Sequence, residues 1–332
     1  MSAIDHPQVS SPSPVDWMPS AGRFVDVDAQ TLRSHFDRKP FLFPHCISAH
    51  PVFSLPRLGA LARKLRAELV EYNSGTIPIS LPDWLDTPYT GLGAQDTLRQ
   101  LAEVCSWMAL KRAETDSDYK VVLDRCLDEI EAVVADTAPG LCERAACIFV
   151  SSPESITPYH MDHEINFLLQ IRGTKTVFVF DGEDRGVVPH RQLEDYFAGD
   201  QLHRNLPFGP ELQKHAIMFE LKEGDGLHIP STFPHWVQNG SEISISISVS
   251  LSSAASLRRA RVYRVNAMLR KMGVDPVPYG EFAISDAPST RHFALCIGCR
   301  DGFRGGARRR RRNDCGQTGD SASPACETVI RP

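Results

Sequence analysis

Short runs rich in β-branched and aromatic residues follow one another from about residue 144 to residue 252, with turn residues between them. They include "ACIFVSS", "EINFLLQI", "KTVFVFD", "HAIMFEL", "DGLHIP", "HWVQNG" and "ISISISVSL". Many short strands without long helices between them are typical of a β-sandwich or barrel. This succession limits the fold more than any other feature of the chain.

Helical patterns flank this β-rich part on both sides. Before it, apolar residues recur at helical spacing in "DAQTLRSHFDRK", "PRLGALARKLRAEL", "AQDTLRQLAEV" and "SDYKVVLDRCLDEIEAVVAD", with strands predicted at "FLFPHCI" and "SWMALKR". Asp28 is suited to cap the first helix, and Pro56 to begin the second. After it, residues 254 to about 273 predict one more helix. The expected class is therefore mainly β (α+β), with a mixed N-terminal region and a C-terminal helix.

The two ends of the chain differ in composition from the rest. Residues 1–20 are rich in Ser and Pro, and residues 284–332 are rich in Gly, Arg and Ser, so we expect both to be disordered. One domain of residues 21–283 is expected between them, with its barrel at about 144–252. In the tail, Arg308 to Arg312 could contact nucleic acid, but a solvated segment is the preferred interpretation. Cys296 and Cys299 form a CxxC pair without a second pair, which is a weak zinc motif.

Charge and hydropathy exclude several classes of function. The net charge of −5 gives no general attraction to nucleic acid or to an anionic membrane. No apolar run approaches the roughly 20 residues that span a bilayer. The N-terminus has no basic start followed by an apolar stretch, and the nine cysteines have irregular spacing, so we expect reduced thiols and a cytoplasmic protein.

A histidine and an aspartate stand two residues apart at the start of one β-rich run, in "TPYHMDHEINFLLQ". In a strand, residues i and i+2 project from the same face, so His160 and Asp162 are expected side by side, whereas His163 should point away. An imidazole and a carboxylate on one face make two thirds of a mononuclear metal site. The pair alone is weak, because such spacing is common by chance and a strand histidine is usually packed.

The third ligand is expected from a distant strand pair, "EGDGLHIPSTFPHWVQNG". This segment resembles the second cupin motif in its Gly224, Pro230, His235 and Asn239. The spacing selects His235 over His228, which we expect to line the pocket beside the metal. Two histidines and one carboxylate hold one face of Fe(II) and leave three positions open, whereas structural zinc sites are closed by four ligands.

The chain resembles the JmjC, or cupin-like, Fe(II)/2-oxoglutarate-dependent oxygenases, and within them the asparaginyl hydroxylases that inhibit hypoxia-inducible factor. The residues that carry the resemblance are Thr157, Pro158, His160, Asp162, Asn166, Phe167, Gln170, Ile171, Gly173 and Lys175. The family implies a double-stranded β-helix, or jelly roll, with iron on His160, Asp162 and His235. It also implies that Lys175 and Thr157 bind 2-oxoglutarate, with Asn166 beside it. A buried dicarboxylate needs a cation, and Lys175 is the only lysine in the two strands nearest the motif.

One position departs from the family. Ser248 stands where the hydroxylase carries an asparagine near the co-substrate, so its contact with 2-oxoglutarate is the least certain of the set. It belongs to the alternating "ISISISVSL", whose serines we expect to face into the barrel, with the isoleucines packed under helices.

The resemblance implies an oxygenase that uses dioxygen and 2-oxoglutarate to hydroxylate a protein side chain or a small molecule. Demethylation is the same chemistry and stays open, whereas the carboxylate of Asp162 argues against halogenation. The alternatives are a non-catalytic cupin that binds a metal or ligand as a regulator, and a metal-dependent isomerase or dioxygenase of the wider cupin family. In the C-terminal helix, Val262, Val265, Leu269 and Met272 form an apolar seam that packs either on its own barrel or in a homodimer.

Overall fold

The computed structural model describes residues 18–19, 22–81, 93–101, 105–199 and 204–281. The expectations for residues 1–17 and for the tail, including Cys296, Cys299 and the arginine run, lie outside the described residues.

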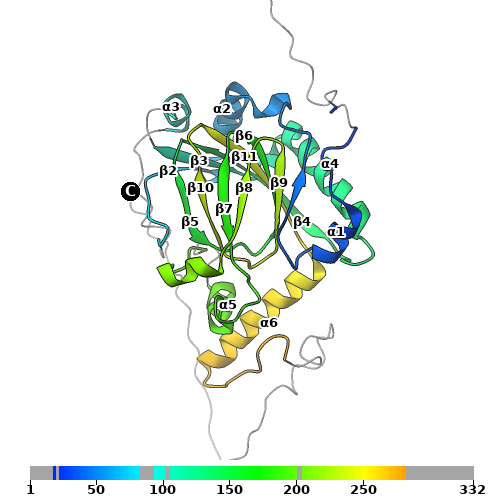
Figure 1. The fold of residues 1–332 in the computed structure, drawn as a ribbon. Helices are drawn as coiled ribbons and strands as arrows, with labels where there is room; N and C mark the ends of the chain where they lie inside the picture. Colours follow the sequence, from blue (N-terminus) through cyan, green and yellow to red (C-terminus); the bar gives the residue numbers. More distant parts are fainter. Residues whose placement is uncertain (1–17, 20–21, 82–92, 102–104, 200–203, 282–332) are drawn as a thin grey trace, which may run out of the picture. The chain divides into compact units, whose positions relative to one another are not determined.

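Two antiparallel sheets form the centre of the described structure (Figure 1). The seven-stranded sheet has the order β1 (Phe41–Pro44), β9 (Asp225–Ile229), β6 (Ile165–Arg172), β11 (Ser244–Ser252), β4 (Cys142–Ser151), β3 (Ser106–Lys111) and β2 (Val70–Ser74). The four-stranded sheet has the order β5 (Ile156–His160), β10 (His235–Asn239), β7 (Lys175–Val179) and β8 (Ile217–Leu221). This is the α+β jelly-roll architecture predicted from the sequence. Strands β1, β2 and β3 extend the large sheet with residues that precede the predicted barrel.

Strand β11 shows how the sequence pattern sets the two faces of the large sheet. Its apolar residues, from Ile245 to Leu251, belong to the core that packs under helices, as predicted. Its serines face the other way: Ser246 and Ser248 donate to or accept from side chains inside the barrel. A smaller apolar cluster, which includes Val177, joins the inner faces of the two sheets. The strict period of two therefore gives one strand an apolar outer face and a polar inner face.

Helices cover the outer face of the large sheet. They are α1 (Ala29–His35), α2 (Leu55–Lys64), α3 (Ala94–Arg99) and α4 (Ser117–Val134), with short 3-10 helices at Pro51–Phe53, Ala67–Leu69 and Ala113–Thr115. A further 3-10 helix, Pro210–His215, lies beside Trp236 of the small sheet instead. The predicted cap is present, because the carboxylate of Asp28 accepts a 2.7 Å hydrogen bond from the backbone N–H of Thr31. Helix α4 buries residues at helical spacing, among them Val122, Cys126 and Ile130.

Two further helices, α5 (His190–Ala198) and α6 (Ala254–Lys271), pack against each other at one end of the sheets (Figure 1). The C-terminal helix was predicted, whereas α5 and strand β2 were not. The buried face of α6 carries Tyr263, stacked on Phe197 of α5. The predicted apolar seam of α6 does not coincide with this buried face. Val262, Val265 and Leu269 are half-buried, and Met272 is 62% exposed.

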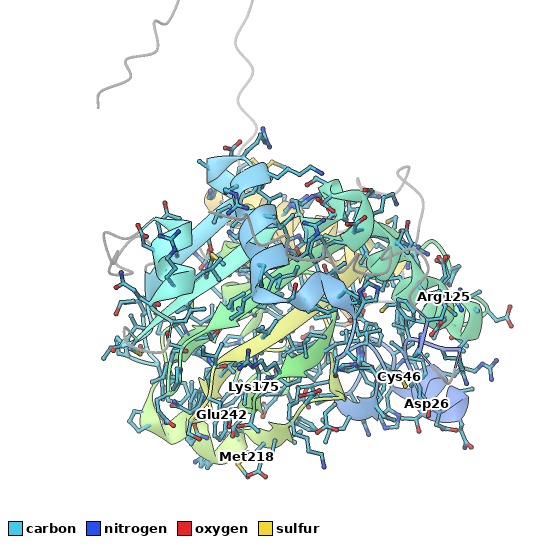
Figure 2. The ribbon with its side chains drawn as sticks, turned by 90° about the horizontal axis from the view of Figure 1, so that it is seen from above. Asp26, Cys46, Arg125, Lys175, Met218 and Glu242 are labelled. Atoms are coloured by element: carbon cyan, nitrogen blue, oxygen red, sulfur yellow. The ribbon has the colours of Figure 1, made fainter. Side chains whose placement is uncertain are left out.

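Exposure also separates the inner strands from the outer ones. Figure 2 places Lys175 among the strands, while Met218 of β8 lies at the periphery and is 58% exposed. In the part of the chain that the structure describes, no helix combines the length and the apolar character needed to cross a membrane.

Candidate metal centre

Three side chains from separate parts of the chain converge at one end of the barrel. His160 is the last residue of β5, and His235 is the first residue of β10; the two are register partners in the small sheet. Asp162 lies two residues beyond the end of β5, so the predicted pairing within one strand is wrong in its local geometry. The turn after β5 nevertheless brings its carboxylate to the histidines. Ligand atoms of the three residues lie within 4.8 Å of one another.

Backbone carbonyls orient both imidazoles. Nδ1 of His160 lies 2.7 Å from the carbonyl oxygen of Pro158, and Nδ1 of His235 lies 3.1 Å from that of Phe233. A carbonyl only accepts, so each Nδ1 carries the proton and each Nε2 presents a lone pair. Metal-binding histidines characteristically donate their other ring N–H in this way.

The donor set fits a divalent cation. A divalent ion holds nitrogen and oxygen at about 2.0–2.2 Å, so two ligands on the same side of one ion lie roughly 3–3.6 Å apart. His235 Nε2 is 3.9 Å from Asp162 Oδ2, which is slightly longer than this spacing. Burial, followed by the nearby His235, lowers the pKa of His160 to about 4, which keeps this imidazole neutral and able to coordinate.

The carboxylate of Asp162 is held on both oxygens. Oδ1 lies 2.8 Å from Nη1 of Arg204, and Oδ2 accepts a 3.0 Å hydrogen bond from the amide of Asn166. Ser248 in turn donates to the amide oxygen of Asn166 at 2.9 Å. Burial acts to raise the pKa of Asp162, but Arg204 and the two histidines lower it well below its ordinary value. The group is therefore a carboxylate with a fixed orientation.

A buried lysine lies in the same cavity as the triad. Lys175, at the start of β7, is 6% exposed and donates a 2.8 Å hydrogen bond to Ser246. Burial lowers the pKa of its ammonium group to about 7. The cavity has a volume of about 280 Å³, and its lining includes every residue predicted for metal or co-substrate binding: Thr157, His160, Asp162, Asn166, Lys175, His235 and Ser248.

Sequence reasoning missed other residues of this cavity. Arg204 stands in a segment without a recognisable motif, and only its 2.8 Å contact with Asp162 marks it. An ion pair between Glu71 of β2 and Lys111 of β3 also contributes to the lining, beside Trp107. Glu71, Trp107 and Lys111 come from the mixed N-terminal region, which precedes the predicted barrel within the same expected domain.

The two extra histidines lie outside the triad. His163 belongs neither to the triad nor to the cavity lining, and its Nδ1 lies 3.2 Å from Oε2 of Glu164. The expectation that His228 lines the pocket is wrong: its ring packs among Phe36, Phe41 and Phe167, and it is absent from the cavity lining. Strand parity explains this, because its neighbours Leu227 and Ile229 take the inner face.

Residues 94–250 match the family model described as a cupin-like domain. The matched segment contains all seven residues predicted for the site. No curated protein sequence matches the chain.

Several solved structures of one Escherichia coli protein, YcfD, are similar to this chain. An X-ray structure of YcfD has 18% sequence identity and a TM-score of 0.49, over 81% of this chain and 63% of that one. YcfD described as a ribosomal oxygenase, in complex with cobalt and 2-oxoglutarate, has 18% identity and a TM-score of 0.46, over 82% and 63% of the two chains. Its complex with cobalt and succinic acid has 16% identity and a TM-score of 0.42, over 82% and 62%. The present chain thus spans less than two thirds of the length of these relatives.

Proposed function

We propose that this protein is an Fe(II)- and 2-oxoglutarate-dependent oxygenase. The observation that carries the proposal is the combination, in one cavity, of a His–Asp–His triad and a buried amine. Three ligands on one side leave positions open for a co-substrate and dioxygen, and such a triad is diagnostic of non-haem Fe(II) oxygenases. A structural metal would not require Lys175.

Some residues of the site would bind the metal, and others would orient its ligands. His160, Asp162 and His235 would hold iron, with Asn166 and Arg204 keeping the carboxylate in place. When bound, iron would supply dioxygen activation coupled to the conversion of 2-oxoglutarate to succinate and carbon dioxide.

The co-substrate explains the buried lysine. A buried ammonium group with one hydroxyl partner is costly, and its depressed pKa expresses that cost. A carboxylate of 2-oxoglutarate beside Lys175 would return the missing charge partner. Thr157 of β5 lines the same cavity and would donate a hydrogen bond. Ser248 bonds to Asn166, so its part would be to fix that amide.

The primary substrate would be a protein side chain or a small molecule that enters the same cavity. We also propose a homodimer through α6, supported by the partial exposure of its apolar seam, of which Met272 is the most exposed residue. The described cysteines, Cys46, Cys105, Cys126, Cys142 and Cys147, are all free thiols, which supports a reducing, cytoplasmic environment.

Succinate formation tests the function. The full chain, supplied with Fe(II), dioxygen and 2-oxoglutarate, should form succinate, whereas the Asp162→Ala variant should form none. NMR measures the succinate in both reactions. Calorimetry with 2-oxoglutarate and the metal-loaded protein separates the alternatives. Binding of 2-oxoglutarate without any succinate would favour a regulator, and absence of both would reject the proposal.

A further inference from the structure

The loop between β9 and β10, residues 230–234, directly precedes the ligand His235. It also touches a second ligand, because the backbone N–H of Thr232 donates a 2.7 Å hydrogen bond to the carbonyl oxygen of Asp162. Thr232 has a φ of 62°, a left-handed conformation that is strained for a β-branched residue. Such a conformation persists only when the surroundings enforce it.

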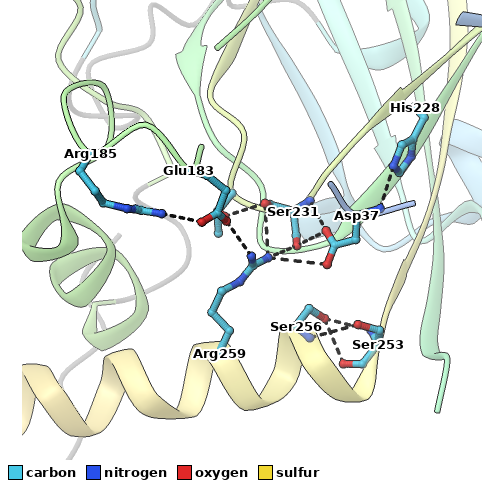
Figure 3. A network of polar contacts seen from close by, with 9 residues as sticks. Asp37, Glu183, Arg185, His228, Ser231, Ser253, Ser256 and Arg259 are labelled. Carbon is cyan, nitrogen blue, oxygen red and sulfur yellow. Dashed lines mark hydrogen bonds and ion pairs between the residues drawn. The ribbon is translucent and has the colours of Figure 1, made fainter. Parts of the chain in front are cut away.

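Asp37 and Arg259 hold Ser231, the residue before Thr232, through polar contacts (Figure 3). The backbone N–H and the hydroxyl of Ser231 donate to Oδ1 of Asp37 at 2.8 and 2.6 Å. Arg259 of α6 donates to the Ser231 hydroxyl and lies 3.7 Å from Oδ2 of Asp37. The side chains of Asp37 and Arg259 are 15% and 12% exposed. We call Asp37, Ser231 and Arg259 the loop clamp.

The segment after β7 packs closely against the same loop. A Cβ atom at Gly182 would lie 2.3 Å from the carbonyl oxygen of Thr232, so the close approach requires glycine. The next residue, Glu183, accepts a 3.1 Å hydrogen bond from Arg259. Polar contacts of Arg259 and Asp37 therefore connect α6, the segment after α1, the loop after β7 and the β9–β10 loop.

A second path leads from Asp37 to the carboxylate of Asp162. The backbone N–H of Asp37 donates to Nε2 of His228 at 3.1 Å, and Nδ1 of His228 lies 3.1 Å from the carbonyl oxygen of Asn166. Nε2 accepts, so Nδ1 carries the proton and donates. Asn166 is the residue whose amide holds Oδ2 of Asp162. Asp37 is thus connected to the triad in two ways. Its carboxylate bonds to Ser231 of the β9–β10 loop, and its backbone N–H bonds to His228.

We infer that Asp37 and Arg259 are positioning residues for the metal centre, acting through the β9–β10 loop on Asp162 and His235. The inference rests on the proposed metal site but concerns residues that touch no metal or substrate. Partners that orient metal ligands typically change metal affinity by about 10- to 100-fold when removed. The location of the pair suggests a directing role, because both Asp37 and Arg259 bond to Ser231 in the loop that leads to His235.

Cobalt binding to the full chain tests this inference, measured by calorimetry and by the visible spectrum of bound Co(II). Asp37→Asn and Arg259→Met should each raise the cobalt dissociation constant by about 10-fold or more and change the spectrum. The matched controls are Glu194→Gln and Arg270→Met, each of which breaks another largely buried ion pair, the one that joins α5 to α6. These controls should lose thermal stability but keep wild-type cobalt affinity and spectrum.

The outcomes separate the inference from the proposed function. Wild-type affinity and spectrum in both clamp variants would overturn the inference and leave the metal site intact. A wild-type protein that binds no cobalt would overturn both. Where Asp37→Asn yields too little folded protein, Ser231→Ala removes one hydroxyl from the same contacts and must weaken cobalt binding in the same direction.

Discussion

Lys175 and Ser246 form a 2.8 Å hydrogen bond inside the barrel, and among the described residues no carboxylate pairs with this lysine. If 2-oxoglutarate supplies the missing carboxylate, Lys175→Ala leaves a buried anion without its cation. We expect a loss of about 3–5 kcal/mol in 2-oxoglutarate binding, measured by calorimetry. Cobalt affinity should stay near the wild-type value.

The Ser246→Ala variant is the control for this experiment, because it removes the hydroxyl partner and keeps the ammonium group. It should weaken 2-oxoglutarate binding much less than Lys175→Ala. Equal 2-oxoglutarate affinity in wild type and Lys175→Ala would show that the co-substrate lies elsewhere.

The depressed pKa of Lys175 predicts how 2-oxoglutarate binding depends on pH. Its pKa is about 7 in the folded protein, against an ordinary value of 10.5. The unfolded chain therefore binds more protons between these values, and this residue's contribution to the free energy of unfolding rises with pH across that window. Binding of an anion needs the charged form, so above pH 7 it must take up a proton.

The 2-oxoglutarate dissociation constant should accordingly rise above pH 7, by up to about tenfold per pH unit. Calorimetry in buffers of different ionisation enthalpy measures the proton uptake directly. The Lys175→Arg variant should show no such uptake, since arginine stays protonated. A pH-independent constant in the wild type would mean that Lys175 is already charged or does not bind the anion.

His235 and His228 stand seven residues apart, and the structure gives them different roles. His235→Ala should abolish cobalt binding, because only two ligands of the triad remain. His228→Ala leaves all three ligands and should still bind cobalt at saturating metal, while losing roughly 3 kcal/mol of stability through a buried cavity and two broken hydrogen bonds. Metal content and thermal unfolding of both variants check this. Loss of metal in His228→Ala alone would reverse the assignment.

The sequence predicted the strands of the barrel because short runs rich in β-branched and aromatic residues are separated by turn residues, and in β11 the period of two is also strict. It predicted the triad because a short motif and a glycine–proline–histidine spacing mark His160, Asp162 and His235. Helix α5 was not predicted, because a nine-residue amphipathic stretch is hard to distinguish within a β-rich region.

The roles of Arg204 and Asp37 were not predicted for another reason. Their partners lie 42 and 194 residues away, and neither residue stands in a recognisable motif.

The apolar seam of α6 predicts an oligomer. Val262, Val265 and Leu269 are half-buried, and Met272 is 62% exposed, so the described part of its own chain covers the seam only in part. Burying a charge in an apolar interface is strongly unfavourable. Val265→Asp combined with Leu269→Asp should therefore convert a dimer into monomers, measured by light scattering.

Val121→Asp, at an exposed valine of α4, is the matched control and should leave the mass unchanged. An unchanged mass in the double variant, with a lower unfolding temperature, would assign the seam to intramolecular packing.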